Sequence, residues 1–160
     1  VSVHKFADLW DGINCLLSYK TGQHYVNEQL TTAATQTGTT FKLVHGPVWV
    51  ELYGGPYRGL KFTAYLKTTA GTATARFILS KDPVSGASET STSYTDGGAY
   101  TADVTTTATT LTYASTTLSV GSIPWIANSP GGGCWVTIEI KNTTTNTVTL
   151  NSFKISEVPL

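Results

Sequence analysis

Residues 134–158, CWVTIEIKNTTTNTVTLNSFKISEV, carry the clearest structural signal in this chain of 160 residues. Apolar and polar side chains alternate in both halves of the stretch, and the polar run KNTTTN at 141–146 separates the halves. A period of two is typical of β-strands that bury one face. The stretch therefore predicts two consecutive strands joined by a turn.

The parity of the alternation changes within the second of these strands. Val148 and Leu150 occupy even positions, whereas Phe153 and Ile155 occupy odd ones. Successive side chains of a strand point to opposite faces, so one extra residue is needed to keep both pairs on the same face. We predict a bulge or bend at residues 151–152.

The same alternation recurs upstream in short segments separated by turn residues. These segments are 48–52, 60–66 and 73–79 and, more weakly, 100–104, 109–113 and 118–120. A short turn containing Gly71 joins the second and third segments, which predicts a hairpin. Strands at intervals of about 8–12 residues with almost no helix predict an all-β fold. We expect a single antiparallel β-sandwich of about eight strands, jelly-roll-like, with a short N-terminal arm.

The first forty residues lie outside this pattern. Within residues 1–30, apolar side chains recur at spacings of three and four, which indicates a short helix that anchors on a partner or packs on its own core. Those side chains are Phe6, Leu9, Trp10, Ile13 and Leu17. Residues 31–40, TTAATQTGTT, contain no large apolar residue and are interpreted as a linker. The sandwich domain is then expected to span residues 41–160.

Composition limits the partners. Charged residues make up 12% of the chain, about half of the usual ~25%, and the formal net charge is zero. Nucleic acid is therefore not expected as a partner, and no apolar run approaches the ~20 residues of a membrane span. The chain contains thirty threonines. A surface of hydroxyl groups in place of charges suggests a rigid extracellular or virion protein.

The sequence contains no recognisable catalytic arrangement. The three histidines, His4, His24 and His45, lack metal-ligand spacing, and no HExxH, GxSxG or phosphate-binding loop is present. Glu51 and Glu139 are each in mid-strand, either as a glycosidase-like pair or as two solvated residues. We predict no catalytic residue, no metal and no cofactor, and thus a protein that is not an enzyme.

Two further polar features have open interpretations. Cys15 and Cys134 lie far apart without CxxC spacing, so they form either a disulfide or two buried free thiols. Asn142-Thr143-Thr144 matches the N-glycosylation sequence, which also arises by chance in a chain so rich in threonine.

Aromatic residues provide the candidate contact site. Trp49 and Tyr53 share the face of their strand opposite the apolar row, and Tyr57 follows in the adjoining turn. Trp125 lies in a Gly- and Pro-rich loop, where it plugs the core or contacts a partner. Sugars stack on such rings, and protein partners use them as hot spots. The alternative is that another strand or the N-terminal arm covers this face.

Two segments also show a resemblance to a known group of proteins. GLKFTAYLKT at 59–68 with ATARF at 73–77, and the closing stretches at 134–140 and 148–157, resemble strands of jelly-roll modules in bacteriophage decoration and fibre proteins and related carbohydrate-binding domains. The resemblance implies a structural or adhesive module, commonly trimeric. It implies no catalytic residue, and it assigns no particular binding residue.

We therefore expect a virion structural protein, a capsid decoration or fibre-head domain, at a virion or other extracellular surface. Its partners would be other copies of itself, with a trimer favoured, and a capsid or fibre protein. One alternative is a carbohydrate-binding module or adhesin tip that binds surface glycans. The other is a subunit of a surface filament or layer that completes its neighbour's sandwich with the N-terminal segment.

Overall fold

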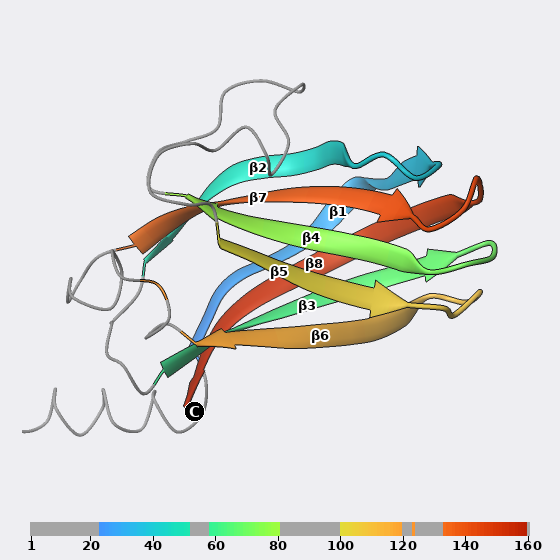
Figure 1. Cartoon of the computed structure of the whole chain (residues 1–160). Coiled ribbons are helices and arrows are strands. Elements are labelled where there is room, and N and C mark those ends of the chain that lie inside the picture. Colours follow the sequence, from blue (N-terminus) through green and yellow to red (C-terminus); the bar gives the residue numbers. More distant parts are fainter. Residues whose placement is uncertain (1–22, 52–57, 81–99, 120–122, 124–132, 160) are drawn as a thin grey trace, which may run out of the picture.

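The computed structural model describes residues 23–51, 58–80, 100–119, 123 and 133–159. Within these ranges the chain forms eight strands and no helix, as Figure 1 shows. The strands are β1 (Gln23–Thr37), β2 (Lys42–Glu51), β3 (Arg58–Thr68), β4 (Ala73–Ser80), β5 (Tyr100–Thr106), β6 (Thr112–Ser119), β7 (Gly133–Asn142) and β8 (Thr147–Pro159). The all-β prediction is confirmed. No helix long and apolar enough to cross a membrane occurs in the described residues.

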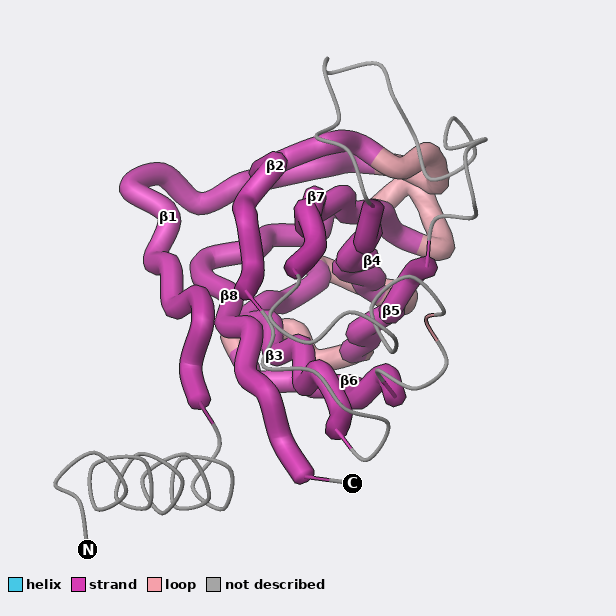
Figure 2. Tube along the Cα trace, turned by 90° about the vertical axis from the view of Figure 1, so that its left-hand side faces the viewer, coloured by secondary structure: helices cyan, strands magenta, loops and turns pink. Residues whose placement is uncertain are grey.

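Two four-stranded antiparallel sheets face each other (Figure 2). Sheet I has the strand order β1-β8-β3-β6, and sheet II has the order β2-β7-β4-β5. Of the consecutive strands, β4 and β5 are neighbours in one sheet, and every other consecutive pair crosses from one sheet to the other. Eight strands arranged in this way form a jelly roll.

The strand order corrects the predicted hairpin. Residues 60–66 and 73–79 are strands, as expected, but β3 belongs to sheet I and β4 to sheet II. β7 and β8 are likewise strands of different sheets, β7 of sheet II and β8 of sheet I. A crossing between sheets and a hairpin bury the same alternate side chains, so the alternation predicts the strands and leaves their pairing open.

The N-terminal boundary is also corrected. β1 begins at Gln23 and continues to Thr37, so most of the expected linker is an edge strand of sheet I. Ala34 pairs with Leu150 of β8 and packs against the core. The threonines that suggested a linker are β-branched residues, which suit a half-exposed strand. The five apolar residues of the expected arm lie outside the described residues.

The core lies between the sheets and centres on three phenylalanines. Phe77 of β4 in sheet II lies 4.9 Å from Phe62 of β3 and 6.3 Å from Phe153 of β8, measured between ring centroids. All three rings are at most 2% exposed. The alternating residues Val136, Ile138 and Ile140 are buried in the same cluster, as their positions predicted.

The predicted bulge in β8 is confirmed. Tyr65 of β3 pairs with Ser152, and the next residue, Leu66, pairs with Leu150. Asn151 is therefore the extra residue. It keeps Leu150 and Phe153 on the buried face despite their opposite parity.

Cys134 is a free thiol in the core of sheet II. Burial raises its pKa to about 12, because the apolar surroundings disfavour the charged thiolate. The side chain therefore behaves as a small apolar group, in agreement with the second of the two interpretations for this residue. Cys15 lies outside the described residues.

Asn142 connects two turns at one end of the sandwich. Its Nδ2 donates hydrogen bonds to Oγ1 of Thr68 at 2.7 Å and to the carbonyl of Ala70 at 3.0 Å. Its Oδ1 accepts from the backbone N–H of Thr144 at 3.0 Å. The side chain is fully buried, so the glycosylation motif here is a structural turn with no space for a glycan.

Candidate functional site

Two tyrosines stack on the outer face of sheet I. Tyr65 of β3 and Tyr113 of β6 are direct register partners, and their neighbours Leu66 and Ala64 point into the core. The ring centroids are 4.4 Å apart with an interplanar angle of 23°. Tyr113 is 71% exposed, which is unusual for a large aromatic side chain. Tyr65 supports one side of the pair and leaves the other side open to solvent.

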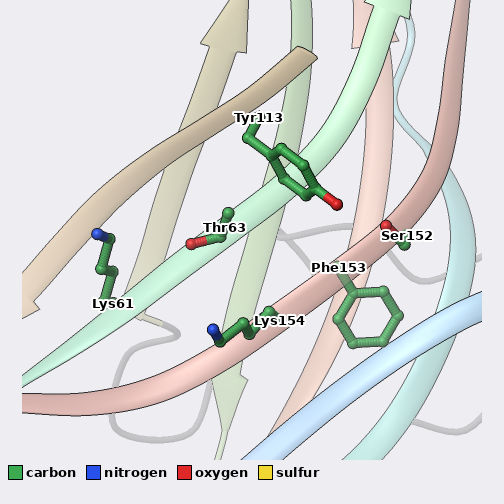
Figure 3. A pocket seen from close by; sticks show the side chains of 6 residues that line it. All are labelled: Lys61, Thr63, Tyr113, Ser152, Phe153 and Lys154. Atoms are coloured by element: carbon green, nitrogen blue, oxygen red, sulfur yellow. The ribbon is translucent and has the colours of Figure 1, made fainter. Parts of the chain in front are cut away.

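A hollow of about 380 Å³ adjoins the exposed ring. Figure 3 shows its polar lining, which comprises Lys61 and Thr63 of β3 with Ser152 and Lys154 of β8. The hydroxyl group of Tyr113 points toward Ser152. The open ring offers a ligand a stacking surface, and the polar groups beside it offer hydrogen-bond donors and acceptors.

Register explains how these side chains come together. Tyr65 lies between Tyr113 on β6 and Ser152 on β8, and two residues along β3, Thr63 lies opposite Lys154. Two residues further, Lys61 has the same outward orientation, because side chains two apart share a face. The site is thus a regular patch of three adjacent strands.

The outer face of sheet II carries charges that compensate one another. Arg76 of β4 donates from Nε to Asp103 of β5 at 2.7 Å and from Nη2 at 2.8 Å. Its Nη1 lies 3.8 Å from Oε1 of Glu139, and its guanidinium stacks 4.1 Å from the Phe41 ring centroid. The hydrogen bonds to Asp103 raise the pKa of Arg76 above its ordinary value, although burial opposes the rise. This cluster stabilises the sheet and offers no uncompensated charge to a ligand.

Two interpretations that concern Glu139 are corrected, namely that it is a solvated residue and that it forms a glycosidase-like pair with Glu51. Glu139 is buried and paired with Arg76, so it is no solvated surface residue. Glu51 pairs in register with Gly133, six residues along β7 from Glu139. At about 3.3 Å per residue, the two positions are ~20 Å apart, too far for a pair of glycosidase carboxylates.

Trp49, the first of the predicted contact residues, lies on the outer face of sheet II and is 45% exposed. Its ring meets that of its register partner Trp135 edge-on, with centroids 5.3 Å apart. The ring also packs on Gly133, where an added Cβ would lie 2.6 Å from Cζ2 of Trp49. The other three predicted contact residues, Tyr53, Tyr57 and Trp125, lie outside the described residues.

His45 packs on the core. Its ring centroid lies 4.9 Å from that of Phe153 at an angle of 55°. In the part of the chain that the structure describes, no three His, Cys, Asp or Glu residues come together as a metal-binding group.

The fold defines a jelly-roll β-sandwich, and comparisons with known proteins add little to that class. No family model and no curated protein matches the chain. Among solved structures, the chain is similar to the CBM22-1–GH10 modules of N-terminal endo-1,4-beta-D-xylanase 10B from Clostridium thermocellum, crystallised with xylohexaose. The TM-score is 0.41 at 12% identity, over 83% of this chain and 28% of that one. The fold assignment rests on the strand order given above.

The tyrosine pair was not predicted from the sequence. Tyr65 alternates with Ala64 and Leu66, so the pattern did place it on the outward face of its strand. The sequence holds no signal that β3 and β6 are neighbours, because they pair across a long intervening stretch. The pair exists only once the strand order is known.

Proposed function

We propose that this domain is a non-catalytic carbohydrate-binding module, with the outer face of sheet I as its binding surface. The observation that carries the proposal is the Tyr113 ring, 71% exposed and supported from behind by Tyr65. Stacking on Tyr65 contributes to stability through one face of the ring only, so the open face is available to a ligand that covers it.

Sugars match this surface in two respects. The C–H face of a pyranose is apolar and stacks on an aromatic ring, and its hydroxyl groups exchange hydrogen bonds with side-chain hydroxyls. The patch offers both, since Thr63 and Ser152 line the hollow beside the ring. A patch that extends over three adjacent strands suits a chain of sugars that lies across them.

Replacing Tyr113 with alanine is expected to weaken glycan binding about 10-fold, because stacking on one ring is worth roughly 1–3 kcal/mol in comparable aromatic platforms. Binding would be measured by a glycan array and then by calorimetry with the best oligosaccharide. Tyr113→Phe keeps the ring and is expected to retain most of the affinity. Thr101→Ala, at an exposed position of β5 in sheet II, serves as the control.

Three results would contradict the proposal. The first is no binding to any glycan on the array. The second is an affinity unchanged by Tyr113→Ala. The third is loss of binding in Trp49→Ala alone, since that variant removes an exposed aromatic ring of sheet II, away from the proposed surface. Thermal unfolding of each variant would confirm that it folds, because Tyr113 lies outside the core.

A second candidate function is attachment within a virion or other extracellular assembly, as a decoration or fibre-head domain. The low charge, the thirty threonines and the eight-stranded jelly-roll order support it. Viral capsid and lectin domains share that strand arrangement, so the argument is one of fold-level analogy. We expect a trimer in light scattering after size-exclusion chromatography. A monomer over the micromolar range would count against this function and leave the glycan-binding proposal intact.

A further inference from the structure

The outer face of sheet I carries positive charge that the rest of the described chain does not balance. Lys61, Lys67 and Lys154 all lie on this face, and none of them forms an ion pair in the described ranges. The carboxylates with described side chains lie elsewhere. Asp103 and Glu139 are on the outer face of sheet II, and Glu157 is buried opposite Leu60.

Within the residues that the structure describes, the outer face of sheet II differs, because carboxylates accompany its arginine. On sheet II, Arg76 is compensated by Asp103 and Glu139, and Lys141 lies 4.3 Å from the Phe41 ring centroid. On sheet I, two of the three lysines line the same hollow as Tyr113. Two ammonium groups beside an aromatic hollow, with no described carboxylate on the same face, favour an anionic ligand there.

We propose that the ligand of the tyrosine site is an anionic glycan, whose sugars carry carboxylate or sulfate groups. This inference rests on the proposed carbohydrate-binding function and names its substrate class. One sugar stacks on Tyr113, and the acid groups of neighbouring sugars meet the ammonium groups of Lys154 and Lys61.

Strand geometry sets the length of the ligand. Lys154 lies two strands and one two-residue step from Tyr113, a Cα separation of about 12 Å. Lys61 lies one strand and two such steps from Tyr113, about 14 Å. These spans require an oligosaccharide, since one sugar cannot stack on the ring and reach both lysines. The hydroxyl of Thr63 lies between Lys61 and the ring, where it serves the intervening sugar (Figure 3).

Two pairs of probes test the charge requirement with the full chain. Oligogalacturonate is compared with the same oligosaccharide after methyl esterification, and dextran sulfate with dextran. Within each pair the sugar backbone is constant and the charge differs. We expect the charged member to bind more tightly. We also expect its affinity to fall as the ionic strength rises from about 0.1 to 1 M, where the Debye length shortens from ~10 to ~3 Å. The difference in affinity between the charged and the neutral member is then compared between the two pairs. The pair with the larger difference shows whether carboxylate or sulfate groups are recognised.

Variants then locate the charge. Lys61→Ala and Lys154→Ala are each expected to weaken binding of the charged probe about 5-fold, as is usual for exposed ion pairs, with a smaller effect on the neutral probe. Lys42→Ala removes the same charge from sheet II and is expected to change neither affinity. Because all three side chains lie at the surface, the variants are expected to fold normally, and circular dichroism would verify this.

The outcomes separate this inference from the function on which it rests. If neutral and charged probes bind equally and the lysine variants have no effect, the anionic ligand is excluded while glycan binding stands. If no oligosaccharide binds, the proposed function itself fails. If oligothymidylate or poly-glutamate binds as tightly as oligogalacturonate, the face is a general anion surface, and the glycan-specific inference is overturned.

Discussion

Replacing Phe77 with alanine is expected to lower the free energy of unfolding by about 3–5 kcal/mol. The side chain is fully buried and comes from sheet II, whereas its partners Phe62 and Phe153 come from sheet I. The substitution therefore removes the ring that joins the two sheets at the centre of the core. Backbone hydrogen bonds hold each sheet rigid, so the neighbouring strands cannot collapse fully into the space, and a cavity remains.

Urea unfolding followed by tryptophan fluorescence would measure the effect. Tyr113→Ala truncates an aromatic ring of similar size at a 71% exposed position, where only the stacking on Tyr65 is lost, and is expected to change the free energy by less than about 1 kcal/mol. In Phe77→Leu, the leucine side chain fills most of the volume of the phenylalanine ring. Its loss of unfolding free energy is expected to lie between those of Phe77→Ala and Tyr113→Ala. Equal effects of the two alanine variants would mean that Phe77 is not the contact between the sheets that the geometry indicates.

Replacing Arg76 with leucine is expected to destabilise the fold by about 3 kcal/mol. Glu139 would then keep a buried carboxylate, 1% exposed, without the guanidinium that lies 3.8 Å away. Asp103 would lose two charge-assisted hydrogen bonds. This expected loss of stability is at the lower end of the range for breaking a buried ion pair, because the side chain of Arg76 is 23% exposed and that of Asp103 is 39% exposed.

A double-mutant cycle with Glu139→Gln isolates the charge contribution. In the Glu139→Gln background, no buried carboxylate remains to be neutralised. Arg76→Leu is therefore expected to lower the free energy of unfolding by much less than it does in the original protein. Arg76→Lys keeps the charge but cannot reproduce the bidentate contact, and an intermediate loss is expected. Additive effects of Arg76→Leu and Glu139→Gln would show that the pair makes no stabilising contact.

Local patterns predicted a large part of this fold. The alternation at Val136, Ile138 and Ile140 identified buried positions, and the parity change between Leu150 and Phe153 located the bulge at Asn151. Both predictions succeed for the same reason. A strand has a period of two whatever its partner is, so its apolar face can be read from adjacent residues alone.

Two predictions failed, one for residues 31–40 and one for Glu139. The threonine-rich run at 31–40 was interpreted as a linker, yet most of it is edge strand β1. An edge strand with one partner buries little, so it needs few large apolar residues, and β-branched threonines suffice. Glu139 lies on the face opposite the apolar row, where a solvated side chain is expected, yet it is buried beside a guanidinium on the adjacent strand, in register.

By itself, the sequence determined most of the strand segments, although not β1, together with which of their side chains face the core and where β8 needs an extra residue. The tertiary structure alone decided which strands pair. Pairing placed Tyr65 beside Tyr113, Arg76 between Asp103 and Glu139, and the lysines of β3 and β8 on one face. The physical reason is that alternation is a local property of each strand, whereas the choice of neighbour depends on how all eight strands bury their faces together. The candidate site consists of side chains from three different strands, so it depends on that second step.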